Sequence, residues 1–206
     1  MPALASPVAD ERGALREYLS YHQGAFFAVA YGLTDEQART RPTASELSVG
    51  GLIKHVTCMQ RTWMSRVAAA PDAPPKDPRS FDEIAKDFAD QHVMRDDETL
   101  EQLIHEFTKE NATALRLVET ADLDAKVPVP QDIPWFPKGI KDWSVRWVIL
   151  HVINELTRHS GHADIIRESI DGATMYELLA ALEGWSIDGF VQPWKPEQAG
   201  QPGADA

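Results

Sequence analysis

Hydrophobic and polar positions along the chain follow the period of an α-helix. Apolar residues recur at steps of three and four in four long stretches, at residues 10–33, 48–67, 97–121 and 144–170. A helix with this spacing gathers its apolar side chains on one face, which must be buried against other helices. No stretch of useful length shows the alternation that indicates a β-strand. The pattern therefore predicts an all-α fold, a four-helix bundle.

The breaks between these stretches predict the connections. A long crossover, residues 68–96, joins the second and third helices; four prolines interrupt its first part, and residues 81–88 are expected to form a short helix. Asp171 and Gly172 form a typical C-terminal stop for the fourth helix, and a short extra helix follows at residues 174–182. Because the crossover is long, the second and third helices need not be antiparallel neighbours.

Length and charge narrow the class of protein. A chain of 206 residues favours a single domain over residues 1–206, with its core at about 10–183 and a flexible tail at 192–206. Lys and Arg number 20 against 32 Asp and Glu, so the formal net charge is −12. An acidic chain lacks the positive field that attracts nucleic acid or anionic lipid, so neither is expected as a partner.

Targeting signals and cysteine content bear on the location of the protein in the cell. The longest nearly apolar run, residues 24–33, is much shorter than the roughly 20 residues that span a bilayer. The N-terminus lacks the basic and apolar regions of a signal peptide. A single cysteine, Cys58, excludes an intramolecular disulfide and fits a reducing compartment. We therefore expect a soluble cytoplasmic protein.

Three side chains on two helices form a candidate metal site. On a helical wheel of the fourth helix, Glu155 lies at the margin of the apolar stripe and His159 lies inside it, one turn later. A carboxylate that faces a core is costly unless it is paired or coordinates a metal. His55, at the edge of the buried stripe of the second helix, adds a second imidazole. Two imidazoles and one carboxylate suit a catalytic zinc with an open position, or another divalent transition metal. A buried ion pair between Glu155 and a protonated His159 is the alternative.

The remaining candidates carry weaker signals. His151 could replace a ligand or support one, and His162 could line the pocket. Cys58 is expected to be an inert thiol rather than a ligand or nucleophile. The other histidines are expected to be structural: His22, His92 and His105. Tryptophans are expected to pack, in the core or around the entry to the fourth helix, where they could border a pocket: Trp63, Trp135, Trp143 and Trp147.

The fourth helix also carries a family signature. Residues 144–172 contain the pattern Glu-x-x-x-His-x-Gly-His-x-Asp-x-x-Arg-Glu, and further matching pieces lie at 33–42, 47–55 and, more weakly, 121–124. With these motifs the chain resembles the DinB-like superfamily, and specifically the actinobacterial branch related to mycothiol-dependent enzymes. The resemblance extends over roughly residues 10–172.

The resemblance implies a function for these residues. In such proteins one histidine of the second helix and two residues of the fourth bind a divalent metal, which here are His55, Glu155 and His159. Glu155, where many members have histidine, is similar to the arrangement in mycothiol-dependent maleylpyruvate isomerase. Zinc is the expected metal, with nickel or another transition metal as alternatives, and mycothiol is the expected thiol cosubstrate. The resemblance also implies a homodimer.

Two classes of function remain open at this point. The first is a metal-dependent thiol transferase or isomerase, in which the metal activates the thiol of mycothiol or a related small thiol for attack on an electrophile. His162, Arg158 and Arg167 are its candidate substrate-binding residues, and the two long loops before the third and fourth helices are expected to shape its pocket. The second is a non-catalytic metal-binding stress or interaction protein, with metal-dependent hydrolysis as a third alternative.

Overall fold

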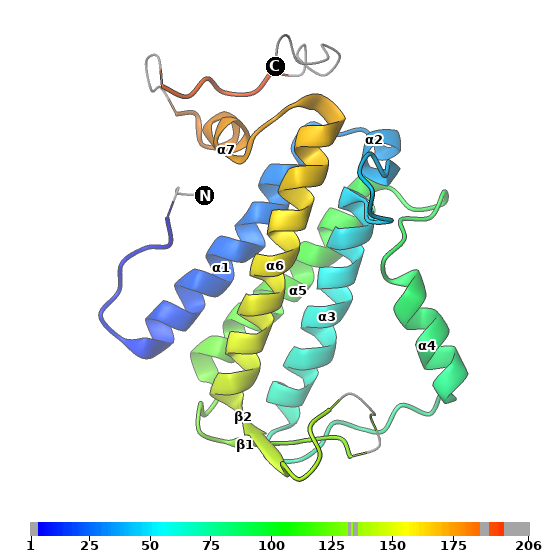
Figure 1. The fold of residues 1–206 in the computed structure, drawn as a ribbon. Helices are drawn as coiled ribbons and strands as arrows, with labels where there is room; N and C mark the ends of the chain where they lie inside the picture. The colour runs from blue at the N-terminus through cyan, green and yellow to red at the C-terminus, as the bar shows by residue number, and fades with distance from the viewer. Residues whose placement is uncertain (1–3, 132, 134–135, 186–189, 196–206) are drawn as a thin grey trace.

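The fold is an all-α four-helix bundle, as the sequence predicts. The computed structural model describes residues 4–131, 133, 136–185 and 190–195. Within these residues the long helices run almost the whole length of the molecule (Figure 1). Their bounds are α1 Glu11–Ala30, α3 Val49–Ala69, α5 Leu100–Thr120 and α6 Val145–Asp171.

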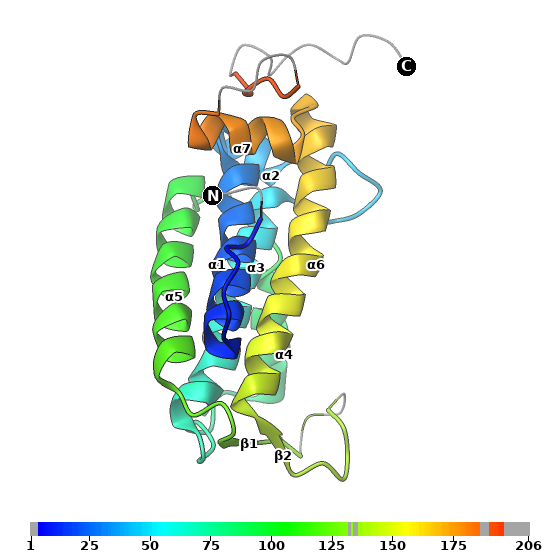
Figure 2. The ribbon, with the colours of Figure 1, turned by 90° about the vertical axis from the view of Figure 1, so that its left-hand side faces the viewer.

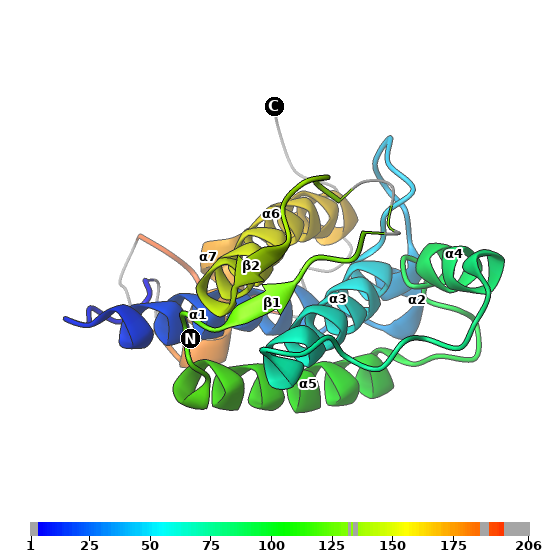
Figure 3. The same ribbon diagram turned by 90° about the horizontal axis from the view of Figure 1, so that it is seen from below.

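The four helices pack in a ring in the order α1, α5, α3, α6, so that α1 and α3 face each other across the core. Figure 2 shows α1 between α5 and α6, and Figure 3 shows α3 on the far side of the ring from α1. Lys54 pairs with Glu98 at 2.8 Å, just before α5, and Arg61 pairs with Glu110 of α5 at 2.8 Å. Later residues of α3 thus meet later residues of α5, so the two helices run in the same direction. The crossover therefore joins two parallel neighbours, which a short turn cannot do.

Polar caps begin the helices close to where the sequence predicts them. The hydroxyl of Ser48 accepts from the N–H of Gly51, and that of Ser144 accepts from the N–H of Trp147, which begins α3 and α6. Gly172, at φ 76°, ends α6 as expected. α5 begins three residues later than predicted, because Thr99 provides its N-cap.

Shorter elements lie at the ends and along one side of the bundle (Figure 1). The predicted short helices are present, and a further one lies between α1 and α3. β1 and β2 pair antiparallel, with Val127 opposite Trp143, in the proline-rich region where no strand was predicted. A strand of three residues is too short to produce a periodic signal. The bounds of these elements are α2 Asp35–Arg39, α4 Phe81–Asp90, α7 Met175–Glu183, β1 Lys126–Pro128 and β2 Asp142–Ser144.

The core follows the predicted apolar stripes with one exception. Phe26 and Phe107 are fully buried and meet edge to face at 5.6 Å between ring centroids, while Leu156 and Val152 fill the α6 side. Tyr18, which the pattern of α1 places on its apolar stripe, is 54% exposed, because a phenol can keep its hydroxyl in water. Among the described helices, none has the length and hydrophobicity to cross a bilayer.

Candidate metal centre

The edge of the ring between α3 and α6 carries the candidate site. The two helices run antiparallel, so the first half of α3 lies beside the middle of α6 (Figure 1). His55 lies two turns into α3, and Glu155 and His159 lie one turn apart on α6. The packing of two amphipathic helices therefore brings together the three side chains that the sequence singles out.

The three side chains have the spacing of a metal site. One potential ligand atom from each of His55, Glu155 and His159 lies within 4.8 Å of the other two. The rings of His55 and His159 meet edge to face at 4.7 Å, and Nε2 of His159 lies 3.6 Å from a carboxylate oxygen of Glu155. His55 is buried, whereas the side chains of His159 and Glu155 keep 14% and 27% of their surface exposed. The cluster is therefore closed on the α3 side and reachable from solvent on the α6 side.

The chemistry of these donors fits a divalent cation. Nδ1 of His55 and Nδ1 of His159 are buried without a hydrogen-bond partner among the described residues, and a buried polar nitrogen without a partner is costly. Two imidazoles and one carboxylate form a ligand set suited to zinc and related metals. A cation bound by one nitrogen of each imidazole would also compensate the charge of the carboxylate.

The electrostatics disfavour the alternative of a simple ion pair. Burial lowers the pKa of His159, and Glu155 only partly opposes this, while His162, His92 and Arg158 lower it further. His159 is therefore neutral at pH 7 and provides no positive charge for Glu155. Burial, together with His92 and His159, lowers the pKa of His55 to about 3. Both imidazoles thus keep the unprotonated form that metal ligation requires.

The low pKa of His55 makes the stability of the metal-free protein depend on pH. Its folded pKa of about 3 lies below the roughly 6.5 of an unfolded histidine, so only the unfolded chain takes up a proton between these values. The contribution of His55 to the free energy of unfolding is fully present above pH 6.5 and is lost as the pH drops toward 3, by up to about 1.4 kcal/mol per pH unit. Urea unfolding between pH 7 and 5.5 measures the slope. His55→Gln is expected to reduce it; an unchanged slope would contradict the assignment.

Two aromatic residues of the crossover cover the site, and the sequence did not single them out for this role. The ring of His92 stacks on that of His55 at 4.1 Å, and Phe88 of α4 meets His55 at 6.3 Å and His92 at 5.2 Å. Nδ1 of His92 lies 3.0 Å from the Phe88 carbonyl, which can only accept, so Nδ1 carries the proton. His92 was expected to be structural; the structure places it against the candidate ligands.

A close backbone contact holds His92 in this position. A Cβ on Gly51 would lie 2.2 Å from the His92 carbonyl oxygen, so only glycine allows the crossover to approach α3 so closely. Gly51 precedes His55 by one turn and therefore lies on the same face of α3. The same contact that docks the crossover thus places the His92 ring over His55.

Gly51→Ala is therefore expected to destabilise the protein by about 1–3 kcal/mol and to displace His92. Gly161→Ala is the matched control. Gly161 is also inside a long helix, but a Cβ there meets no atom within 4 Å, so alanine should stabilise α6 by about 0.5–1 kcal/mol. Denaturant unfolding of both variants measures the difference. Equal effects of the two substitutions would show that the crossover does not depend on the contact.

The three candidate substrate-binding residues lie in different environments. His162 is near the site, with its ring 5.5 Å from that of His159. Arg158 is exposed and close enough to lower the pKa of His159. Arg167 is fully buried two turns further along α6, where it bonds Asp171 and the carbonyls of Val29 and Tyr31. The structure therefore gives Arg167 a structural role away from the candidate centre.

An aromatic cluster extends from the site toward the β-strands. His151 stacks on Trp147 at 5.2 Å, Trp147 stacks on Trp143 at 5.0 Å, and Trp63 of α3 meets His151 at 4.4 Å. His151 therefore belongs to this wall, and burial lowers its pKa, an effect that Glu155, one turn away, only partly opposes. Trp135, expected in the same cluster, lies outside the described residues.

The other two histidines and the cysteine lie apart from the cluster of ligands. His22 is on α1 and His105 is on α5, away from the α3–α6 edge. Cys58 follows His55 by three residues and is partly buried. Burial is the main cause that raises the pKa of its thiol, and a protonated thiol is a weak nucleophile.

Comparisons with known proteins agree with this fold. A family model described as mycothiol-S-transferase matches residues 14–172, a range that includes His55, Glu155 and His159. No curated protein matches the chain. A crystal structure of a conserved protein from Enterococcus faecalis is similar with a TM-score of 0.54 and 15% identity, covering 81% of this chain and 100% of that chain. At this identity the likeness shows the fold alone.

Proposed function

The chain belongs to the mycothiol-S-transferase family of the DinB-like superfamily, and from this membership we propose that it is a divalent-metal-dependent thiol transferase. In this proposal the thiol of mycothiol, or of a related small thiol, attacks an electrophile. The observation that carries the proposal is the convergence of His55, Glu155 and His159 on the α3–α6 edge, inside the matched range.

The residues of the chain would have distinct roles. His55, Glu155 and His159 would hold the ion, and zinc is the metal that this donor set favours, with nickel as an alternative. A divalent ion bound there would favour the thiolate form of a thiol at neutral pH. Phe88 and His92 lie against His55 on the α3 side, while Arg158 and His162 lie where polar groups of a substrate can reach them.

Cys58 supports the use of an external thiol. Its raised pKa keeps the thiol protonated at neutral pH, and the sequence contains this single cysteine. A nucleophile for group transfer would therefore come from a small thiol rather than from the protein.

A cytoplasmic location, where small thiols are kept reduced, belongs to the same proposal. The proposal also includes a homodimer, which size-exclusion chromatography with light scattering tests.

The test uses zinc-loaded protein with mycothiol and 1-chloro-2,4-dinitrobenzene. In transfer, a carbon–sulfur bond forms, the carbon–chlorine bond breaks, chloride leaves and the thiol proton passes to solvent. We expect thioether formation that depends on both metal and thiol. Cys58→Ser is the control that should keep the activity. Dinitrophenol as the product would indicate hydrolysis instead, and metal binding without turnover of several electrophiles would favour a non-catalytic metal-binding protein.

A further inference from the structure

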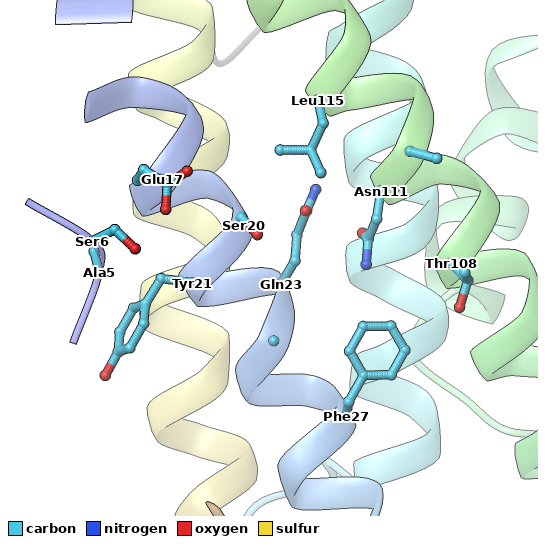
Figure 4. A pocket seen from close by; sticks show the side chains of 12 residues that line it. Ala5, Ser6, Glu17, Ser20, Tyr21, Gln23, Phe27, Thr108, Asn111 and Leu115 are labelled. Atoms are coloured by element: carbon cyan, nitrogen blue, oxygen red, sulfur yellow. The ribbon is translucent and has the colours of Figure 1, made fainter. Parts of the chain in front are cut away.

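A cavity lies on the edge of the bundle opposite the candidate metal centre. It is formed by α1, α5 and the N-terminal segment before α1, and has a volume of about 410 Å³ (Figure 4). The candidate ligands belong to α3 and α6, which contribute none of its lining residues. Its volume lies within the range of small-molecule sites, which is about 300–1,000 Å³. The cavity is therefore separate from the site of the proposed transfer reaction.

A chain of buried amides forms the inner wall of this cavity. Gln23 of α1 and Asn111 of α5 line it and are 3% and 6% exposed. Both reach Gln60 of α3, which is fully buried: Nε2 of Gln23 donates to Oε1 of Gln60 at 2.8 Å, and Nε2 of Gln60 donates to Oδ1 of Asn111 at 2.9 Å. Three polar side chains in a helical core are costly unless their hydrogen bonds are made.

The two ends of this amide chain have unused hydrogen-bonding groups. Gln60 uses both its oxygen and its nitrogen, whereas Gln23 and Asn111 each use one of the two. Within the described part of the molecule, Oε1 of Gln23 and Nδ2 of Asn111 have no protein partner. Each of these two atoms keeps some solvent-accessible surface, so both can be reached from the cavity. The inner wall of the cavity thus offers one acceptor and one donor.

This pairing does not depend on how the amides are oriented. If the oxygen and nitrogen of all three side chains exchange places, both internal hydrogen bonds are kept with reversed direction. Gln23 then offers the donor and Asn111 the acceptor. One donor and one acceptor face the cavity in either case. A carboxamide has the matching pair of groups along one edge, an oxygen that accepts and an N–H that donates.

The rest of the cavity wall selects for shape and charge. Phe27 of α1 and Leu115 of α5 provide an apolar surface in the lining (Figure 4). Glu17 is the charged residue of the lining, and the whole chain carries a net charge of −12. Because Arg16 already pairs with Glu17 at 2.8 Å, the described lining offers an anion no unpaired cation, and the net charge of the chain opposes it, while a neutral molecule with a flat apolar body meets no such penalty.

We propose that the α1–α5 cavity binds a small neutral molecule that has a flat apolar body and a carboxamide edge. The edge would bond to Gln23 and Asn111, and the body would lie against Phe27 and Leu115. The proposal does not depend on the thiol-transferase function, because it involves neither the candidate ligands nor the crossover.

Benzamide is the probe and benzoate, which has the same shape and a negative charge, is its control. In titrations of the full chain monitored by NMR, benzamide should shift the side-chain NH₂ signals of Asn111 and Gln23 in a saturable way. Benzoate should bind at least about ten-fold more weakly, because it lacks the N–H donor and meets Glu17. Shifts that map instead to α3 and α6, equal binding of the two probes, or no saturable shift would each overturn the proposal.

Ala112→Phe tests the place of binding without disturbing the core. Ala112 is exposed on α5 and lines the cavity, so a phenyl ring there would fill the space while the helix is kept. Benzamide binding should weaken by at least about ten-fold. Ala85→Phe, at an exposed helical alanine of α4, is the matched control and should leave it unchanged. Unchanged binding to Ala112→Phe would place the benzamide elsewhere and overturn the proposal.

Discussion

His159→Ala is expected to lower the affinity of the protein for a divalent ion by more than about 100-fold, so that the purified variant retains no metal. Loss of groups that only support the ligands already costs about 10–100-fold, and loss of one of three ligands should cost more. His159 is central to the cluster, since its ring meets that of His55 at 4.7 Å and lies beside Glu155. Its removal leaves one imidazole and one carboxylate on different helices.

Metal analysis of the purified protein and competition titration with a zinc chelator measure this effect. His105→Ala is the matched control, because His105 is an exposed histidine on α5 and its loss should leave the metal content unchanged. Circular dichroism checks that both variants are helical. Full metal content in His159→Ala would show that the ion, if bound, is held elsewhere, and would remove the basis of the proposed function.

Asp171→Ala is expected to lower the free energy of unfolding by about 3–5 kcal/mol, because it leaves a buried guanidinium without its counter-charge. The side chains of Arg167 and Asp171 are 0% and 1% exposed and meet at 2.9 Å. Arg167 also donates to the Val29 carbonyl at 2.7 Å and lies 4.8 Å from the ring centroid of Trp194. This one side chain therefore connects α6 to the end of α1 and to the C-terminal segment.

The melting temperature should fall by roughly 10 °C, given about 2–4 °C per kcal/mol for a chain of this size. Calorimetry of the metal-free protein measures it. Asp77→Ala is the control: it breaks a carboxylate–arginine pair that is exposed to solvent, and should not change the melting temperature measurably. The double variant Arg167→Met, Asp171→Ala should be more stable than Asp171→Ala, since it contains no unpaired buried charge. A single variant as stable as the parent protein would refute the structural role of the pair.

Helical periodicity was sufficient to find the trio of candidate ligands but not the residues that cover it. His55, Glu155 and His159 lie on the buried margins of two regular helices, where the wheel gives the direction of each side chain. His92 lies in a connection without a regular period, and its position depends on the close contact with Gly51. A sequence signal existed in the glycine itself, since Gly51 inside an amphipathic helix indicates a close approach of another segment.

Arg167 shows the converse limit. The family motif placed it among candidate substrate-binding residues, and its position on α6 is close to the buried stripe. A wheel gives the angle of a side chain about its own helix axis but does not say which neighbour covers it. The structure shows that the end of α1 covers this part of α6, so the guanidinium bonds carbonyls of the chain.

By itself, the sequence determined the all-α bundle, the long crossover between its second and third helices, and the inward direction of the three candidate ligands, because each follows from local helical geometry. Only the tertiary structure decided that these ligands lie within 4.8 Å of one another, that His92 stacks on His55, and that a separate amide-lined cavity lies between α1 and α5. These features depend on which faces of different helices meet, and that is decided by packing between distant segments rather than by the period of any one of them.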